Sequence, residues 1–92
     1  MDIRKQVGWN VRRLRLKRGL SQEALAGDGQ MDTAHVSRIE RGVENPTVVV
    51  LDKLAKALGV DVREFFRPVR AGAALPPVLK KGRKPGTKIR RG

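Results

Sequence analysis

Residues 20–42, which read LSQEALAGDGQMDTAHVSRIERG, contain the pattern that decides the fold of this 92-residue chain. Ser21 is a favourable N-cap because its hydroxyl can accept a hydrogen bond from the first turn of a helix. The apolar residues that follow predict a short helix over 22–26. Gly27 and Gly29 weaken its continuation, because glycine loses more conformational freedom in a helix than any other residue.

A second short helix follows after a tight turn. Asp32 or Thr33 can cap it, Val36 and Ile39 face inward at helical spacing, and Gly42 marks its end. The stretch therefore predicts two short helices joined by a turn.

The flanking sequence predicts further helices on both sides. Before the stretch, a helix over 2–18 has apolar residues at helical spacing, namely Ile3, Val7, Val11 and Leu14. After it, Thr47 caps a helix that stops at Gly59 and has an inner stripe of Val48, Leu51, Leu54, Ala55 and Leu58. Asp61 and Glu64 have capping-box spacing for a last short helix that ends at Phe66. We expect an all-α fold of five helices without a sheet.

Charge divides the chain into two parts. Residues 1–66 hold 12 basic and 9 acidic side chains, whereas residues 67–92 hold 9 basic and none acidic. Prolines and glycines interrupt the second part repeatedly, so it offers no continuous face to bury. We expect a folded domain over 1–67 and a disordered basic tail over 68–92.

The net charge of +12 favours a polyanionic partner, either nucleic acid or an anionic membrane surface. There is no cysteine, and His35 has no companion ligand in the sequence, so we expect no metal and no cofactor. The sequence contains no recognisable combination of a nucleophile with a base, so we expect no enzymatic activity. It also contains no pattern that indicates a small-molecule ligand. Without an apolar run of roughly 18 residues or a signal segment, we expect no membrane insertion and a cytoplasmic location.

Four segments of the sequence, with the spacing between them, closely resemble the lambda-repressor/Cro-like, or XRE-type, helix-turn-helix family. These segments are residues 20–26, 36–42, 45–47 and 54–60. The resemblance runs from about Val7 to Phe66. It implies a compact five-helix bundle whose second helix lies across the DNA backbone and whose third helix enters the major groove.

The resemblance also implies roles for individual residues. Base-reading positions are occupied by short or hydrogen-bonding side chains, which suit base edges: Thr33, Ala34, Ser37 and Arg38. Positions that contact DNA phosphate are occupied by Gln22, Arg41 and Asn45. Arg15 and Glu40 match a partly buried ion pair that joins the first helix to the third and contributes to the orientation of the third helix more than to stability.

Three features of the sequence depart from the family pattern. Gly29 and Gln30 stand where the family has an apolar residue and then a glycine, which predicts a reshaped turn. Glu44 stands in a loop that is commonly basic, which weakens the case for a phosphate contact there. Trp9 lies outside the apolar stripe of its helix, which leaves partial packing or a dimer contact as its role.

The tail contains Gly82-Arg83-Lys84-Pro85-Gly86 after Lys80-Lys81, which resembles an AT-hook without its first arginine. An AT-hook lies in narrow A·T minor grooves. Lys81, Arg83 and Lys84 are therefore candidate DNA contacts, either in the minor groove or on phosphates alone.

These features indicate a sequence-specific transcriptional regulator that binds double-stranded DNA. The simplest form is a repressor that binds an inverted-repeat operator as a homodimer, because one such domain offers few base contacts. Apolar residues near the end of the domain exceed the needs of one small core and favour a dimer: Val60, Val62, Phe65, Phe66, Val69, Leu75, Val78 and Leu79. Two alternatives are an architectural, nucleoid-type protein that relies on its tail, and an antitoxin-like adaptor that holds another protein.

Overall fold

The computed structural model describes residues 2–76 of the chain. This part contains four α-helices and one 3-10 helix and no strand: α1 (Ile3–Lys17), α2 (Gln22–Asp28), α3 (Thr33–Glu40), α4 (Val48–Leu58) and η1 (Val62–Phe66). The all-α prediction is confirmed, but the fifth helix is a 3-10 helix instead of an α-helix. None of the helices in residues 2–76 is long and apolar enough to cross a membrane.

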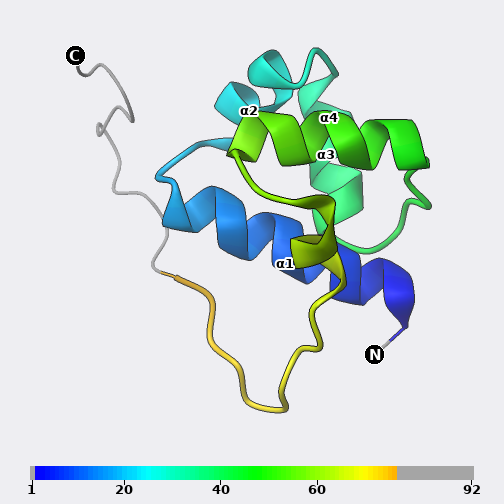
Figure 1. Cartoon of the computed structure of the whole chain (residues 1–92), viewed down its shortest axis with the longest axis vertical. Helices are drawn as coiled ribbons and strands as arrows, with labels where there is room; N and C mark the ends of the chain where they lie inside the picture. The colour runs from blue at the N-terminus through cyan, green and yellow to red at the C-terminus, as the bar shows by residue number, and fades with distance from the viewer. Residues whose placement is uncertain (1, 77–92) are drawn as a thin grey trace.

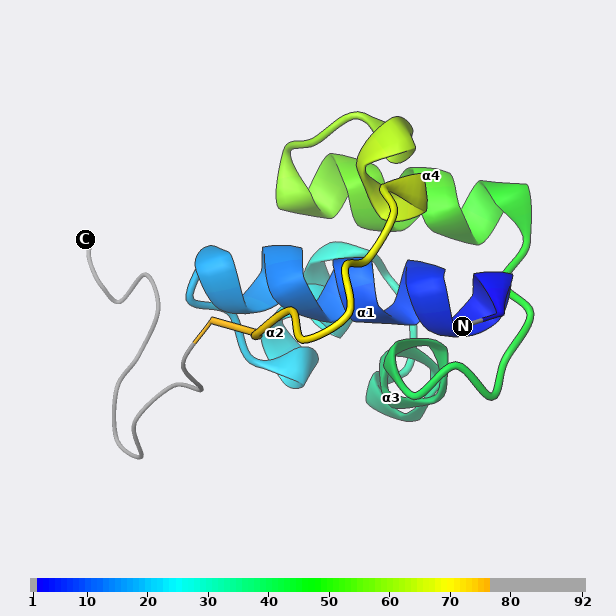
Figure 2. The ribbon, with the colours of Figure 1, turned by 90° about the horizontal axis from the view of Figure 1, so that it is seen from below.

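Helix α1 lies along one side of the bundle, with α2, α3 and α4 all above it in Figure 1. In the view of Figure 2, α4 lies on one side of α1, and α2 and α3 lie on the other. Helix α1 contacts α3, α4 and η1, and α2 contacts α3 and α4. The core between them is aliphatic apart from one phenylalanine, and its members are Val7, Val11, Leu14, Leu25, Ala26, Val36, Ile39, Leu51, Leu54, Ala55, Leu58 and Phe65. Burial of such side chains is the main favourable contribution to folding.

The predicted helix boundaries are largely present. The Ser21 hydroxyl accepts a hydrogen bond from the Ala24 amide at 2.9 Å, and the Thr47 hydroxyl caps α4 in the same way. Gly59 ends α4 in the left-handed conformation, with φ of 69°. Asp32 occupies the N-cap position of α3 without a side-chain capping bond. Helix α2 continues to residue 28, two residues beyond its expected end.

Two residues expected in the core are on the surface instead. Ile3 is 56% exposed and Val48 is 81% exposed. Each is the first residue of its helix. The buried stripes begin one turn later, at Val7 and Leu51, whereas Ile3 and Val48 line a surface hollow.

The turn between α2 and α3 is built without a glycine in the left-handed position. Gln30 occupies that conformation with φ of 57° and is the one such non-glycine residue in the described part of the chain. The Met31 amide donates to the Ala26 carbonyl at 2.9 Å and closes the turn. A side chain with a Cβ is strained in this conformation.

Helices α1 and α3 approach each other backbone to backbone at Gly8. A Cβ added at this glycine would lie 2.2 Å from the Ile39 carbonyl oxygen and 2.8 Å from that of Glu40. Only glycine permits this separation, because both neighbouring atoms belong to the backbone. The contact fixes the C-terminal half of α3 against α1.

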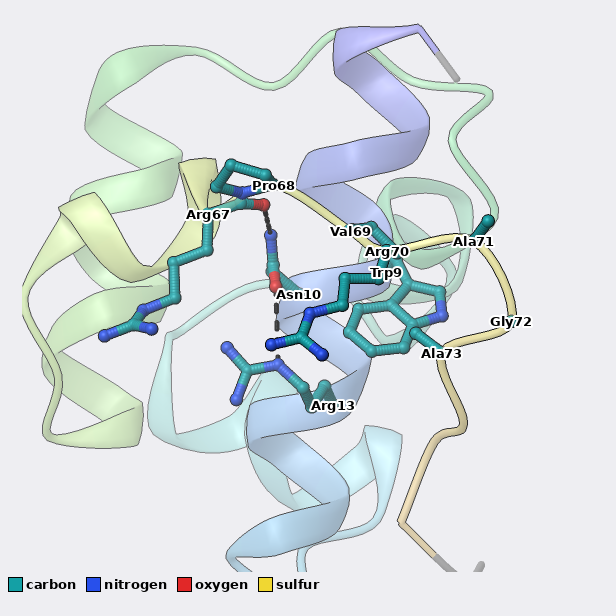
Figure 3. Close-up of a pocket in the computed structure, with 10 residues that line it drawn as sticks. All are labelled: Trp9, Asn10, Arg13, Arg67, Pro68, Val69, Arg70, Ala71, Gly72 and Ala73. Atoms are coloured by element: carbon teal, nitrogen blue, oxygen red, sulfur yellow. Dashed lines mark hydrogen bonds between the residues drawn. The ribbon is translucent and has the colours of Figure 1, made fainter.

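The segment after α4 is held to α1 by side-chain amides. Asn10 is 1% exposed, and its Nδ2 donates to the Phe65 carbonyl at 3.0 Å. It also donates to the Arg67 carbonyl at 2.9 Å (Figure 3). Gln6 donates to the Phe66 carbonyl at 2.8 Å. These bonds satisfy carbonyl groups at the end of η1 that would otherwise lack partners.

Candidate nucleic-acid interface

The outer face of α3 carries the four predicted base-reading residues. Thr33, Ala34 and Arg38 are exposed and Ser37 is half-buried. The opposite face of the helix is buried through Val36 and Ile39. A helix with this division can pack on its own domain and still present methyl, hydroxyl and guanidinium groups to base edges in a major groove.

Arg38 is joined to the loop that follows α3. Its Nε donates to Glu44 Oε1 at 2.8 Å, and His35 Nε2 lies 3.0 Å from the other carboxylate oxygen. The hydrogen bond from Arg38 is the main cause that lowers the pKa of Glu44 below its ordinary value, and the charge of His35 acts in the same direction. Glu44 is therefore an anion at neutral pH, fixed between two residues of α3.

Arg15 and Glu40 form an almost fully buried ion pair. Arg15 Nε donates to Glu40 Oε2 at 2.7 Å and its Nη2 donates to Oε1 at 3.0 Å. Arg15 Nη1 also donates to the Leu20 carbonyl, and Gln22 Nε2 donates to Glu40 Oε1 at 3.0 Å. One carboxylate therefore joins α1, α2 and α3, which is the arrangement expected of a pair that orients α3.

Two of the three predicted phosphate-binding residues lie together. Gln22 and Arg41 line a hollow of about 300 Å³ between α1, α2 and α3, whose other lining residues are Arg12, Arg15, Ser37 and Glu40. Gln22 uses one amide hydrogen for Glu40, which leaves the second for a ligand. Arg41 and Arg12 are exposed cations at the rim. The hollow thus combines neutral and charged donors, which suits a phosphate group.

Arg12 was not among the predicted site residues. It lies three residues before Arg15, so both are on the same face of α1. This spacing was the signal in the sequence that could have identified it.

Asn45, the third predicted phosphate-binding residue, does not line this hollow. Asn45 is in the loop before α4, beside an apolar hollow of about 200 Å³ that Ile3, Val48 and Phe66 also line. The tail residues Lys81, Arg83 and Lys84 are outside the described residues.

Trp9 lies on the wall of a hollow of about 440 Å³ between α1 and residues 67–73 (Figure 3). The Arg13 guanidinium carbon is 6.0 Å from the centroid of the Trp9 ring, and Arg13 Nε donates to Asn10 Oδ1 at 3.3 Å. Trp9 is half-buried in this arrangement, so partial packing accounts for its position within the monomer.

Comparisons with known proteins agree with the geometry. A helix-turn-helix family model matches residues 11–65. The uncharacterised HTH-type transcriptional regulator y4dJ of Sinorhizobium fredii is 46% identical over 68 residues, which cover 74% of this chain and 88% of that protein.

Among solved structures, the restriction-modification controller protein C.AhdI from Aeromonas hydrophila is similar with a TM-score of 0.67 and 41% identity. The similarity covers 68% of this chain and 96% of C.AhdI. The controller C.Esp1396I, solved as a tetramer in complex with its natural 35 base-pair operator, is similar with a TM-score of 0.66 and 32% identity, over 72% of this chain and 87% of that one. With its α3 face and the family match over most of the described bundle, the chain belongs to the XRE-type helix-turn-helix family of DNA-binding transcriptional regulators.

Proposed function

We propose that this protein regulates transcription by binding a specific double-stranded operator through the outer face of α3. The observation that carries the proposal is the position of Thr33, Ala34 and Arg38 on one exposed face, next to the hollow that Gln22 and Arg41 line. In this arrangement α3 reads bases, and the hollow binds a phosphate that fixes the register of the helix on the duplex.

We further propose that the protein acts as a homodimer on an inverted repeat and represses by occluding a promoter. Helix α3 has eight residues and reaches few base pairs, so a second copy is needed for useful specificity. The similarity to two restriction-modification controllers, one of them solved on its operator, favours a small regulator that binds operator DNA. Residues 1–67 would form the DNA-binding unit, and residues 68–92 would add affinity through their charge.

Selection of bound sequences from random duplexes with the full chain tests the proposal. We expect an inverted repeat whose half-sites are about 10 base pairs apart, centre to centre, and a dimer by sedimentation on that DNA. Enrichment that follows only A·T content would favour the architectural alternative. Absence of enrichment, together with a protein that co-purifies from cells, would favour the adaptor alternative.

The proposed division of roles has its own test. Arg38→Ala should cost about 1–3 kcal/mol of operator affinity and relax the preference at one base pair of each half-site. Gln22→Ala should weaken binding to all sequences about equally. Arg63→Ala is the matched control, because it removes an exposed arginine from η1, which packs on α1 and α4. Equal losses for Arg38→Ala on operator and on random DNA would contradict base reading by Arg38.

A further inference from the structure

We propose that Glu44 is a positioning residue for base recognition, which holds the Arg38 guanidinium so that its two terminal nitrogens face a guanine together. This inference rests on the proposed function, because it concerns how α3 reads its operator. It assigns a role to an acidic residue in the loop after α3, where the family pattern commonly has basic residues.

The carboxylate of Glu44 uses both oxygens on α3. Oε1 accepts from Arg38 Nε at 2.8 Å, and Oε2 is 3.0 Å from His35 Nε2. His35 and Arg38 are three residues apart, so they are neighbours on the helix surface. Glu44 is only 28% exposed and is therefore held from two sides, whereas the Arg38 side chain remains 45% exposed.

The hydrogen bond at Nε leaves the Nη1 and Nη2 groups of Arg38 available for DNA. A guanidinium has five N–H groups in a planar fork, and Nε carries one of them. Within residues 2–76, Arg38 Nε to Glu44 is the one side-chain hydrogen bond that Arg38 makes. Guanine presents O6 and N7 as neighbouring acceptors in the major groove, and the Nη1 and Nη2 edge can donate to both.

Fixing Arg38 before DNA arrives favours specific binding. An unrestrained arginine has many rotamers and must lose that freedom when it contacts a base, whereas a restrained one has lost part of it already. A rigid fork also meets a wrong base with unpaired donors, because it cannot turn to find another acceptor. Glu44 should therefore increase the difference in binding affinity between DNA with guanine and DNA with another base at the position that Arg38 reads.

The charge of Glu44 has the opposite effect on general affinity. An anion in the loop after α3 repels DNA phosphates and lowers binding to every sequence. Loss of Glu44 should therefore weaken discrimination and strengthen nonspecific binding together. Loss of a residue that only maintained the fold would instead weaken both discrimination and nonspecific binding.

The test compares wild type, Glu44→Ala, Glu44→Gln and Arg38→Ala on three duplexes: the selected operator, the operator with the guanine replaced, and random DNA. Wild type should prefer the operator over the replaced duplex by roughly 5- to 150-fold, the range for one bidentate contact. Glu44→Ala should reduce this ratio to a few-fold, towards that of Arg38→Ala, and should bind random DNA several-fold more tightly. Glu44→Gln keeps an acceptor for Arg38 Nε, so it should retain part of the preference for the operator over the replaced duplex. It should still bind random DNA more tightly than wild type, because the negative charge is lost.

Asp52→Asn is the charge-matched control. Asp52 is an exposed carboxylate that pairs with Lys56 on α4. Its loss should leave the operator ratio unchanged. If Asp52→Asn lowers the ratio as much as Glu44→Ala does, the effect is general charge and the proposal is wrong.

The possible failures are distinguishable. If Arg38→Ala lowers the ratio but Glu44→Ala leaves it unchanged or raises it, Glu44 only sequesters Arg38, and the proposal fails while the proposed function stands. If wild type does not discriminate among the duplexes, the proposed function fails and the inference with it. An independent readout is the Arg38 Nε–H signal by NMR in the protein without DNA. It should exchange slowly in wild type and rapidly in Glu44→Ala, and rapid exchange in wild type would also overturn the proposal.

Discussion

Replacing Gly8 with alanine should destabilise the domain although alanine is the better helix former. The added Cβ would lie 2.2 Å from the Ile39 carbonyl oxygen, where real Cβ contacts essentially never fall below 3.0 Å. Helices α1 and α3 must therefore separate by about 0.8 Å or more. Neither opposing atom can move away alone, because both are in the backbone of α3.

The magnitude follows from two opposing effects. Alanine gains about 1 kcal/mol over glycine in a helix interior. Overpacking a well-packed contact costs about 1–3 kcal/mol, and more when rigid backbone is the obstacle. We expect a net loss of about 1–2 kcal/mol in the free energy of unfolding, which corresponds to a Tm lowered by roughly 5–15 °C for a domain of this size.

Gly27→Ala is the matched control. Gly27 is an exposed residue of α2, and an added Cβ there would meet no atom within 4 Å. This substitution should stabilise the protein by about 0.5–1 kcal/mol. Urea unfolding followed by circular dichroism measures both variants. A Gly8→Ala protein as stable as wild type, or one that gains stability as Gly27→Ala does, would refute the close approach of α1 and α3.

Three further predictions concern stability and the tail. Asn10→Leu should lower the free energy of unfolding by about 1–3 kcal/mol, because the buried Phe65 carbonyl loses its side-chain donor and the Arg67 carbonyl keeps only Gln6 Nε2 at 3.2 Å, and an unchanged urea midpoint would contradict this. Gln30→Gly should raise stability by about 0.5–1 kcal/mol, because glycine removes most of the left-handed strain at some entropic cost, and a lower Tm would count against it. Removal of residues 77–92 takes away seven basic side chains. It should flatten the slope of log affinity against log salt by about 0.9 per phosphate released and leave the preferred site unchanged, whereas an unchanged slope would exclude DNA contact by residues 77–92.

Local chemistry was sufficient to predict most helix boundaries. Ser21 and Thr47 cap the helices that follow them, and Gly59 adopts the left-handed conformation expected at a helix end. The failures at Ile3 and Val48 have a common cause, because periodicity identifies a face but does not say where neighbouring helices stop covering it. The 3-10 geometry of η1 was likewise invisible in a five-residue segment.

Contacts between distant residues account for what was missed at the site. The Asn10 side chain bonds carbonyls 55 and 57 residues away, and no spacing rule relates them. The bond between Arg38 and Glu44 spans six residues and depends on the path of the loop after Gly42. The ion pair of Arg15 with Glu40 came only from the family resemblance, since two charges 25 residues apart carry no local signal.

The backbone contact at Gly8 has a consequence for how new operators can arise. It holds α3 from behind, so the outward residues of that helix bear little of the packing and are exposed or half-buried. Substitutions at such positions typically change stability by less than about 0.5 kcal/mol. Mutation can therefore alter Thr33, Ala34, Ser37 or Arg38 repeatedly while the domain remains folded. Given the proposed role of this face in reading operators, changes on one helix face would give a lineage of such proteins new target genes, and an engineer can randomise the same four positions on an otherwise constant scaffold.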